Sequence, residues 1–446
     1  MKVCLEFLGC RLNESELQSW AEEFSKQGLM LTTKAQEASV IVLNTCAVTG
    51  EAARKSRQHL RKLHRSNPVA KLVATGCYAS LEPEKVAEIL GVDLVVTNPQ
   101  KQDLVSMVFD QIELPEMPSM ATDPGESAIF SRNRDRAFIK VQDGCRYRCT
   151  YCIVTVARGD ERSRTIEEIV NEVNQHYRQG IREIVLTGVH VGGYGSDIDS
   201  DLYHLVQQIL RQTKIPRIRF ASVEPWDLPE NFFKLFEDKR LMPHMHLPLQ
   251  SGCNSVLRRM SRRCKTEEFA ALIAKAKTLI PEFNVTTDII VGFPGETDEE
   301  WEQTQDFVKL MNFGHIHIFS YSNREGTKAA RLPQQIDANT KKTRSQQLHK
   351  MAIESTTNQL AQQLGKQCEV LLESGKEQLE DGRFRYWGHT PNYYKICLVD
   401  HRDDLGSQIV IIDITGIHAA GSYLETALVA KISDPEASLK HFQWVS

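Results

Sequence analysis

Three cysteines lie close together in the middle of the sequence with the spacing C-x3-C-x2-C: Cys145, Cys149 and Cys152. They follow an apolar alternation at residues 138–141, which predicts a strand that ends just before Gly144. A structural zinc site needs four ligands, usually from two C-x2-C pairs, and no second pair follows here. A 4Fe–4S cluster held by three cysteines leaves one iron open to an external ligand. The spacing favours such a cluster; zinc, or a C-x-x-C redox pair with a bystander cysteine, are the alternatives.

Three further cysteines each follow a predicted strand near the amino terminus: Cys10, Cys46 and Cys77. They are 36 and 31 residues apart, close to the ~30 residues of one strand–helix–strand unit. In an open parallel sheet the carboxyl ends of the strands meet at one edge, where ligands bind. We therefore expect these three thiols to gather at one place and to form a second cluster site.

The loop from Asp143 to Cys152 resembles the signature of the radical S-adenosylmethionine (SAM) enzymes. The resemblance implies a 4Fe–4S cluster on Cys145, Cys149 and Cys152 whose open iron binds the amino and carboxylate groups of SAM. An electron from such a cluster cleaves SAM to a 5′-deoxyadenosyl radical, while the protein supplies position and excludes side reactions. The chain is therefore expected to be an enzyme.

The segments around the amino-terminal cysteines sharpen this resemblance. Residues 8–13, 44–49 and 75–78 are similar to the three cysteine motifs of the methylthiotransferase family, and match best its MtaB branch. That branch methylthiolates carbon 2 of N6-threonylcarbamoyladenosine, the tRNA base beside the anticodon. The resemblance implies that Cys10, Cys46 and Cys77 hold an auxiliary 4Fe–4S cluster that supplies sulfur, and that one SAM gives the methyl group and a second the radical. The implied partners are the anticodon stem-loop of tRNA, an electron donor such as flavodoxin or ferredoxin, and a sulfur source.

Further resemblance places SAM contacts at the ends of later strands. The segments at 186–190, 222–225, 247–252 and 288–295 look like the family's SAM-binding segments, although glycine and proline are also how strands ordinarily turn into loops. The implied cofactor-binding residues are Tyr151, Thr187, Gly188, Ser222, Glu224, Gln250 and Val291. No catalytic residue is assigned beyond the two clusters.

Alternating strands and helices must position these residues, so the fold class is α/β. We expect an N-terminal doubly wound parallel sheet at 1–110, a linker at 111–133, a central partial (β/α)6 barrel at 134–365 and a small C-terminal β-barrel at 366–446. The N-terminal strands are predicted at 3–8, 39–44, 71–74 and 93–96, with helices at 14–27, around 54–65 and at 83–90. The partial-barrel strands are predicted at 138–142, 183–187, 217–222, 244–249, 285–292 and 315–320, with helices at 166–178, 203–212, 230–237, 266–279, 297–311 and 341–364.

Five short β runs from Cys368 to Lys431 predict the C-terminal barrel, which is of OB-like size and resembles the TRAM domain of RNA-modifying relatives. Such barrels bind single-stranded RNA through stacking and backbone contacts. Candidate contact residues, some of which could instead pack the core, are Arg383, Arg385, Tyr386, Trp387, Tyr393, Tyr394 and Lys395. Arg54, Arg57, Arg61 and Arg65 form a basic face on the predicted helix after Cys46.

The composition narrows the class of protein but does not identify a substrate. The chain has 446 residues, a formal net charge of −4 and an odd number of cysteines, eleven, which argues against a disulfide framework. The first residues lack the apolar core of a signal peptide, and no apolar run approaches the length of a membrane span. We expect a cytoplasmic protein without a membrane partner. The alternatives left open are isopentenyl-adenosine tRNA or a ribosomal-protein side chain as substrate, and a non-catalytic iron–sulfur RNA-binding protein.

Overall fold

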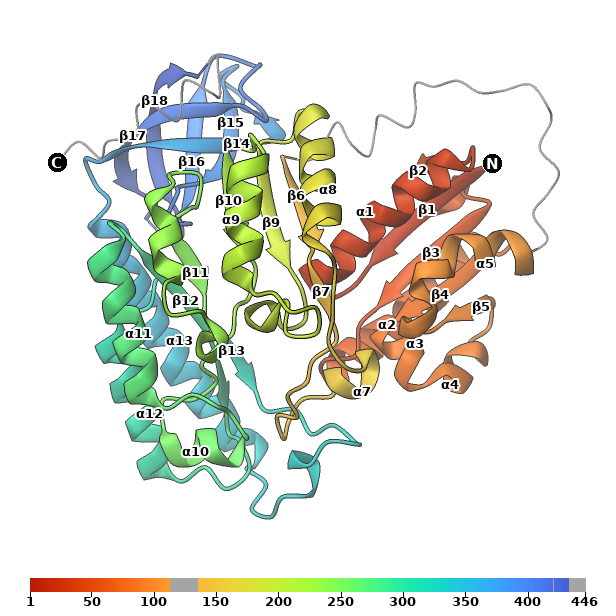
Figure 1. Cartoon of the computed structure of the whole chain (residues 1–446), viewed down its shortest axis with the longest axis horizontal. Coiled ribbons are helices and arrows are strands. Elements are labelled where there is room, and N and C mark those ends of the chain that lie inside the picture. The colour runs from red at the N-terminus through yellow and green to blue at the C-terminus, as the bar shows by residue number, and fades with distance from the viewer. Residues whose placement is uncertain (113–134, 420, 433–446) are drawn as a thin grey trace.

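The computed structural model describes residues 1–112, 135–419 and 421–432, which form three regions (Figure 1). The expected α/β fold class is confirmed: a parallel sheet is followed by a partial barrel and then by a closed β-barrel. Of the predicted linker at 111–133, only Gln111, the last residue of a helix, and Ile112 are described. None of the helices in the described ranges is both long and apolar enough to span a bilayer.

The first region is a five-stranded, fully parallel sheet with strand order β2-β1-β3-β4-β5. Alternate residues of its strands pack on opposite faces: Val40 and Val42 lie in one core, and Ile41 and Leu43 in the other. The doubly wound arrangement is therefore confirmed. Its elements are β1 (Lys2–Phe7), α1 (Arg11–Lys26), β2 (Met30–Thr32), β3 (Val40–Thr45), α2 (Gly50–Ser66), β4 (Lys71–Gly76), α3 (Cys77–Leu81), α4 (Pro83–Ala87), β5 (Val92–Val96) and α5 (Leu104–Gln111).

Two details of this sheet differ from the prediction. The edge strand β2 is only three residues long, too short to show the alternation that identifies a strand. The helix predicted at 83–90 is the shorter α4 (Pro83–Ala87), and the helix directly before it, α3 (Cys77–Leu81), was not predicted. Pro83 supplies the first residue of α4, a position where its missing N–H does no harm.

The second region is a partial barrel of six parallel strands in two three-stranded sheets, β10-β9-β6 and β11-β12-β13. Isolated bridges such as Ser222 with His246 connect the two sheets. Among the described residues β6 does not pair with β13, so the barrel is open on that side. The strands are β6 (Arg136–Lys140), β9 (Glu183–Thr187), β10 (Arg217–Phe220), β11 (His244–His246), β12 (Asn284–Val291) and β13 (His315–Ser320). Two further strands, β7 (Gln142–Asp143) and β8 (Arg162–Ser163), form a separate two-stranded sheet.

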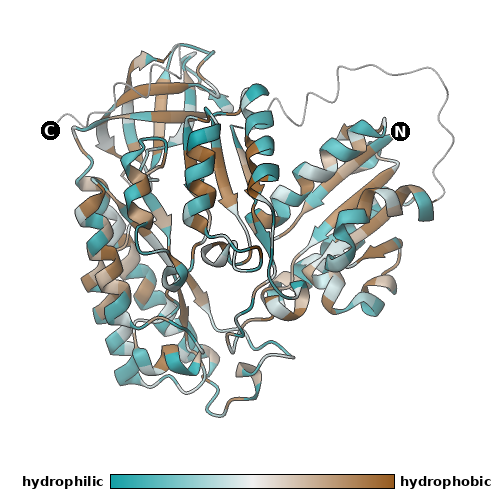
Figure 2. Ribbon diagram, viewed as in Figure 1, coloured by the Kyte–Doolittle hydropathy of each residue, from teal (hydrophilic) through white to brown (hydrophobic). Residues whose placement is uncertain are grey.

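Helices cover the outer face of this barrel, and Figure 2 shows their polar sides turned away from the apolar strands. They are α8 (Ile166–Arg178), α9 (Leu202–Gln212), α11 (Thr266–Leu279), α12 (Asp298–Met311) and α13 (Ala338–Ala361). Two shorter helices are α7 (Val154–Arg158), which packs on the first region, and α10 (Asn254–Arg259), which follows β11. The helix predicted at 230–237 is wrong in type, because residues Phe232–Glu237 form a 3-10 helix. Its buried side chains recur at i and i+3, as in the pair Phe233 and Phe236, which is the spacing that eclipses in a 3-10 turn.

The third region is the expected five-stranded barrel, closed in the order β14-β15-β16-β18-β17. Its strands are β14 (Gln367–Gln378), β15 (Phe384–His389), β16 (Lys395–Asp400), β17 (Ile409–Ile417) and β18 (Leu424–Lys431). Tyr386 and Tyr394 are buried in its core. They are therefore unavailable for stacking on RNA, and Trp387, whose neighbours on β15 point inward, remains partly exposed.

A turn of the third region closes the amino-terminal end of the partial barrel. Arg219 donates a hydrogen bond of 2.9 Å to the carbonyl of Thr390. Tyr393 stacks between His244 and His389, with ring centroids 4.5 and 4.6 Å away. The two barrels are thus joined through buried polar contacts at the amino-terminal ends of the partial-barrel strands. The carboxyl ends of these strands stay accessible for a functional site.

Candidate active site

The structure brings Cys10, Cys46 and Cys77 to one edge of the first sheet, as the strand order requires. The three residues follow β1, β3 and β4, which are neighbours in the sheet. Burial raises the pKa of the Cys46 thiol, and the nearby Cys77 and Cys10 raise it further. Gly9 allows this close approach, since a Cβ there would lie 2.6 Å from the Cys46 sulfur.

The second cysteine group lies on the loop between β7 and α7. The Cys152 amide donates to the carbonyl of Cys149 over 3.0 Å, which folds these two residues into a turn, and the Cys145 amide donates to the carbonyl of Gly159 over 3.1 Å. Gly144, with φ of +73°, begins this loop; a side chain there would clash with the carbonyl of Asp160. Burial raises the pKa of Cys145 to about 12, so a thiolate at this position needs a compensating cation.

The two cysteine groups face each other across the junction of the first two regions. Helix α7, which follows the second group, packs against α3, which begins at Cys77. Ala157 of α7 belongs to the apolar core of the first region. Its carbonyl accepts a 2.6 Å hydrogen bond from Asn98. Burial raises the pKa of the Cys152 thiol to about 11, and the nearby Cys77 is among the smaller causes in the same direction. Both groups therefore border one space.

A buried ion network joins the two cysteine loops. Arg158 donates to the carboxylates of Glu16 and Asp143, at 3.0 Å each, and to the amide oxygen of Asn13 at 2.8 Å. Lys101 lies 2.5 Å from Glu16. Burial alone would raise the pKa of Glu16, but the surrounding positive charges lower it, so the carboxylate stays ionised. Arg158 is therefore a buried structural residue whose partners belong to the protein itself.

The residues expected to contact SAM lie along the rim formed by the carboxyl ends of the strands. Thr187 ends β9 and Gly188 follows it, where a Cβ would lie 3.0 Å from the Gln142 carbonyl. Ser222 and Glu224 follow β10. Gln250 follows β11 and adopts a φ of +83°.

Two of these residues are placed in ways that the sequence does not reveal. Val291 ends β12, but its side chain is buried in the outer core, so only its backbone can contact a ligand at the rim. Its carbonyl accepts a 2.9 Å hydrogen bond from the Tyr321 amide. Tyr151, between Cys149 and Cys152, packs against the apolar group that contains Phe293.

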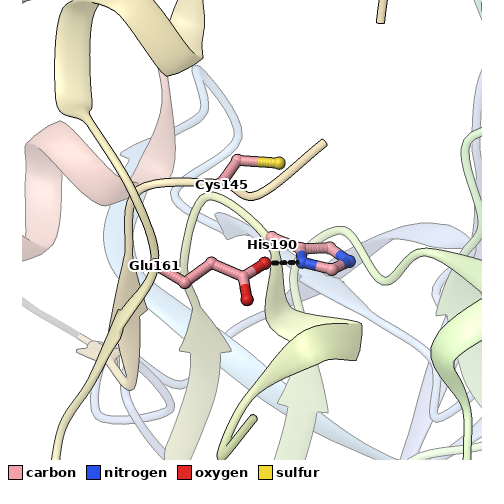
Figure 3. Close-up of side chains that lie close together, drawn as sticks. All are labelled: Cys145, Glu161 and His190. Atoms are coloured by element: carbon pink, nitrogen blue, oxygen red, sulfur yellow. Dashed lines mark hydrogen bonds and ion pairs between the residues drawn. The ribbon is translucent and has the colours of Figure 1, made fainter. Parts of the chain in front are cut away.

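His190 lies beside Cys145 and is hydrogen-bonded to Glu161 through Nδ1 (Figure 3). A second carboxylate, that of Asp227, bonds its Nε2 atom at 2.7 Å. Burial would lower the pKa of His190, but the acidic partners, Glu224 among them, outweigh it and raise the pKa. Ligand atoms of Cys145, Glu161 and His190 lie within 4.8 Å of one another. These contacts fix the wall behind the cysteine loop.

Sequence reasoning missed Glu161 and Asp227, as well as Arg262. The Arg262 guanidinium lies 3.9 Å from the Cys149 sulfur and 4.3 Å above the Trp226 ring. Arg262 belongs to the basic run at 258–263, where neighbouring arginines give no sign of which one turns inward. The carboxylates are separated from His190 by 29 and 37 residues, and no spacing rule connects them.

Several buried polar atoms around this rim have no partner among the described residues: Trp226 Nε1, Arg262 Nε, Tyr321 Oη and Arg324 Nε. Buried polar groups are nearly always hydrogen-bonded, and three of these four atoms can only donate, so they indicate a ligand with hydrogen-bond acceptors. A molecule with carboxylate and ribose hydroxyl oxygens supplies such acceptors. Together with three thiols on one loop, the residues present therefore fit a 4Fe–4S cluster and SAM.

The basic helix after Cys46 begins at this same edge. Thr49 caps α2, and the amide of Gly50 donates to Ser322 of the partial barrel over 3.4 Å. Arg54, Arg61 and Arg65 are exposed, whereas Arg57 lies 5.6 Å from the ring of Tyr78 and is partly buried. The predicted basic face is thus present with three exposed members instead of four.

Comparison with known proteins agrees with this geometry. The radical SAM superfamily profile matches residues 139–308, and that of the uncharacterized protein family UPF0004 matches residues 2–97. The chain is 33% identical, over 97% of both chains, to threonylcarbamoyladenosine tRNA methylthiotransferase MtaB of Bacillus subtilis. It is 35% identical to the protein of that name from Thermotoga maritima, over 83% of this chain and 86% of the relative.

More distant relatives extend the comparison. The tRNA-2-methylthio-N(6)-dimethylallyladenosine synthase of Bacillus subtilis is 34% identical over 83% of this chain and 76% of its own. Among solved structures, the radical SAM methyltransferase TsrM of Kitasatospora setae superposes with a TM-score of 0.53 at 15% identity, over 72% of this chain and 74% of its own, which shows a shared fold alone. Radical SAM membership implies SAM and a 4Fe–4S cluster. The chain belongs to the radical SAM methylthiotransferase family and is an enzyme of that class.

Proposed function

We propose that this enzyme converts N6-threonylcarbamoyladenosine, beside the anticodon of tRNA, into its 2-methylthio derivative. The observation that carries the proposal is the packing of α7, which follows one three-cysteine group, on α3, which begins at a cysteine of the other, in a chain similar over 97% of its length to a protein named for that activity. The substrate is tRNA, presented as the anticodon stem-loop, and an electron donor such as flavodoxin or ferredoxin and a sulfur source complete the reaction.

The cofactor residues are assigned on the same grounds. Cys145, Cys149 and Cys152 would hold the radical SAM cluster, and a second, auxiliary 4Fe–4S cluster would be held by Cys10, Cys46 and Cys77. SAM would contact Tyr151, Thr187, Gly188, Ser222, Glu224, Gln250 and the backbone of Val291. When bound, these groups supply the radical chemistry needed to replace an unactivated aromatic C–H bond.

The chain's own residues position these groups and keep water away. The His190 network holds the wall behind Cys145, and the Arg158 network ties the two cysteine loops together. Arg262 lies over Trp226 beside Cys149 and brings positive charge to the rim. We further propose that residues 1–110 form the methylthiotransferase domain, 111–133 a linker, 134–365 the radical SAM domain and 366–446 an RNA-binding barrel.

Cellular tRNA provides the test of this function. A bacterial strain that lacks its own enzyme for this modification, and that expresses the chain, should contain 2-methylthio-N6-threonylcarbamoyladenosine among its tRNA nucleosides by mass spectrometry. A strain expressing the Cys149→Ala variant is the matched control and should lack it. Methylthiolated isopentenyl-adenosine in place of the threonylcarbamoyl product would contradict the assigned substrate.

The exposed arginines of α2 give a separate prediction about RNA. Because α2 begins at the cysteine edge, its basic face should contact phosphates of the bound stem-loop, and phosphate contacts set affinity and register without reading bases. Arg61→Ala and Arg65→Ala should each weaken binding of modified and unmodified tRNA alike and reduce the salt slope by ~0.7–0.9. Fluorescence anisotropy over a KCl series measures this slope. Arg211→Ala, an exposed arginine of α9, is the control, and an equal effect there would contradict the assignment.

A further inference from the structure

The inner wall of the partial barrel carries two histidines and an aspartate on three adjacent strands. His246 ends β11, Asp288 lies within β12, and His317 pairs with Asp288 across to β13. The His246 Nε2 atom is 3.2 Å from a carboxylate oxygen of Asp288. One ligand atom from each of the three residues lies within 4.8 Å of the other two. Neither the cluster assignments nor the SAM assignments use this group.

A hydrogen bond to Thr286 fixes the orientation of the His246 ring. Its Nδ1 atom is hydrogen-bonded to the hydroxyl of Thr286 at 2.9 Å, which leaves Nε2 directed at Asp288. The same hydroxyl also bonds Nε2 of His244 at 3.1 Å. Such support is typical of imidazoles whose direction matters for binding. Among the described residues no hydrogen bond anchors His317, which contacts the rings of His246 and His315 and is exposed on β13, the strand at the open side of the barrel.

The strand phase places these side chains in the chamber below the rim. Val285, Ile289 and Val291 of β12 are buried in the outer core, so the alternate residues of β12, Asp288 among them, face inward. Ile290, next to Asp288 on that inward face, packs in the same apolar group as Tyr151 of the cysteine loop. Asp288 is thus about 7 Å along the strand from the level of that loop.

We propose that His246, Asp288 and His317 form the subsite that binds the threonylcarbamoyl group of the substrate base. This proposal rests on the proposed function. In adenine, carbon 2 and carbon 6 both flank N1, so a substituent on N6 lies beside the carbon that reacts. The threonylcarbamoyl group carries a carboxylate, a hydroxyl and urea N–H groups. The imidazole N–H groups would donate to its oxygens, and Asp288 would accept from its hydroxyl or N–H groups.

The same geometry predicts that the protein rejects an apolar base. An isopentenyl substituent offers no hydrogen bonds, so it would strand the polar side chains that it covers. Sites built to hydrogen-bond a substrate discriminate strongly against analogues that lack the polar group. His317 is the residue to test, because its neighbours His246 and Asp288 are already paired with each other while it faces the open side of the barrel.

Binding of synthetic anticodon stem-loops to the cluster-loaded protein, with SAM present and no reductant, tests the subsite without turnover. The wild-type protein should bind the stem-loop with threonylcarbamoyladenosine at least about tenfold more tightly than the same stem-loop with plain adenosine, as expected for one hydrogen bond to a charged group. His317→Leu should remove most of this preference and leave affinity for the plain stem-loop unchanged. His204→Ala, an exposed histidine on α9, should keep the wild-type preference.

Each remaining outcome has a defined meaning. A His317→Leu variant that keeps the full preference overturns the subsite, while the proposed function stands if the wild-type protein still modifies the threonylcarbamoyl base. A wild-type protein that neither prefers nor modifies that base overturns both proposals. Two histidines and a carboxylate are also ligands for a divalent cation. The wild-type protein would then bind one Co²⁺ in addition to the cluster iron, and His317→Leu would lose this ion. If His317→Leu nevertheless kept the wild-type preference for the threonylcarbamoyl stem-loop, the three residues would be a metal site and the subsite would be overturned.

Discussion

Cleavage of SAM to 5′-deoxyadenosine should be lost in Cys149→Ala and retained in Cys46→Ala, although neither variant should make methylthiolated product. Cys149 belongs to the group on the β7–α7 loop, beside Arg262 and below the rim where SAM is expected to bind. Cys46 belongs to the group at the edge of the first sheet. Each group has three thiols for a cluster, so loss of one sulfur should disable its own cluster and leave the other.

Iron content and nucleoside analysis separate the two roles. The wild-type protein, reconstituted without oxygen, should hold about eight irons, and each cysteine variant about half of that. Chromatography of 5′-deoxyadenosine and mass spectrometry of the RNA give the two activities. Cys264→Ser, outside both groups, keeps its hydrogen-bonding partner and should behave like wild type.

Circular dichroism must first show that the variants are folded, because loss of a buried metal site can unfold a domain. A folded Cys46→Ala protein that forms product at the wild-type rate would contradict the sulfur-supplying role of the first group. SAM cleavage by Cys149→Ala would contradict the assignment of the second group.

Replacement of Arg158 by methionine should cause the largest loss of stability among single substitutions at the junction. Arg158 and Glu16 are both buried, and removing one partner of such a pair destabilises a protein by about 3–5 kcal/mol because the other charge is left uncompensated. Glu16 retains Lys101, but Asp143 loses the closest cation to its carboxylate. The helices that join the two cysteine loops, α1 and α7, should open more easily.

Hydrogen exchange measures this opening directly. Amides of α1 and α7 should lose about two to three and a half powers of ten in protection, the equivalent of 3–5 kcal/mol. Arg162→Met is the matched control, because Arg162 is exposed on β8 and four residues away. It should change stability by no more than ~0.5 kcal/mol. Equal protection in the two variants would show that the buried network does not hold the junction together.

The sequence was sufficient for the longer strands and for the gathering of the cysteines, but not for short strands such as β2. Buried parallel strands read as continuous apolar runs, and Val40–Thr45, which is buried at every position, is a clear case. A doubly wound sheet places the carboxyl ends of its parallel strands at one edge. The sequence alone therefore predicted that Cys10, Cys46 and Cys77 lie close together. The basic helix and the closed C-terminal barrel followed from periodicity in the same way.

The contacts between regions could not be predicted. Arg158 pairs with Glu16, 142 residues earlier in the chain, and nothing in the local pattern distinguishes a buried arginine from a solvated one. The turn at Tyr393 docks on the partial barrel through a stack of rings that belongs to two regions. Residues of this kind depend on how separate units pack, whereas periodicity reports only which face of one element is covered.

The candidate site shows the same division. The cluster cysteines are defined by spacing, but His246, Asp288 and His317 meet only because β11, β12 and β13 are neighbours with a particular register. His244, two residues before His246, is buried and bonded to Thr286, which fits a structural role. Our subsite proposal gives His246 a role in binding instead.

A direct assay of substrate choice tests the central claim most sharply. The reconstituted protein, with SAM and a chemical reductant, is given three tRNAs of one sequence that carry threonylcarbamoyladenosine, isopentenyladenosine or plain adenosine beside the anticodon. Mass spectrometry of the digested RNA should find the 2-methylthio group on the threonylcarbamoyl base and on neither of the others. Equal turnover of the first two RNAs, or preference for the isopentenyl base, would contradict the assigned substrate while leaving the family membership intact.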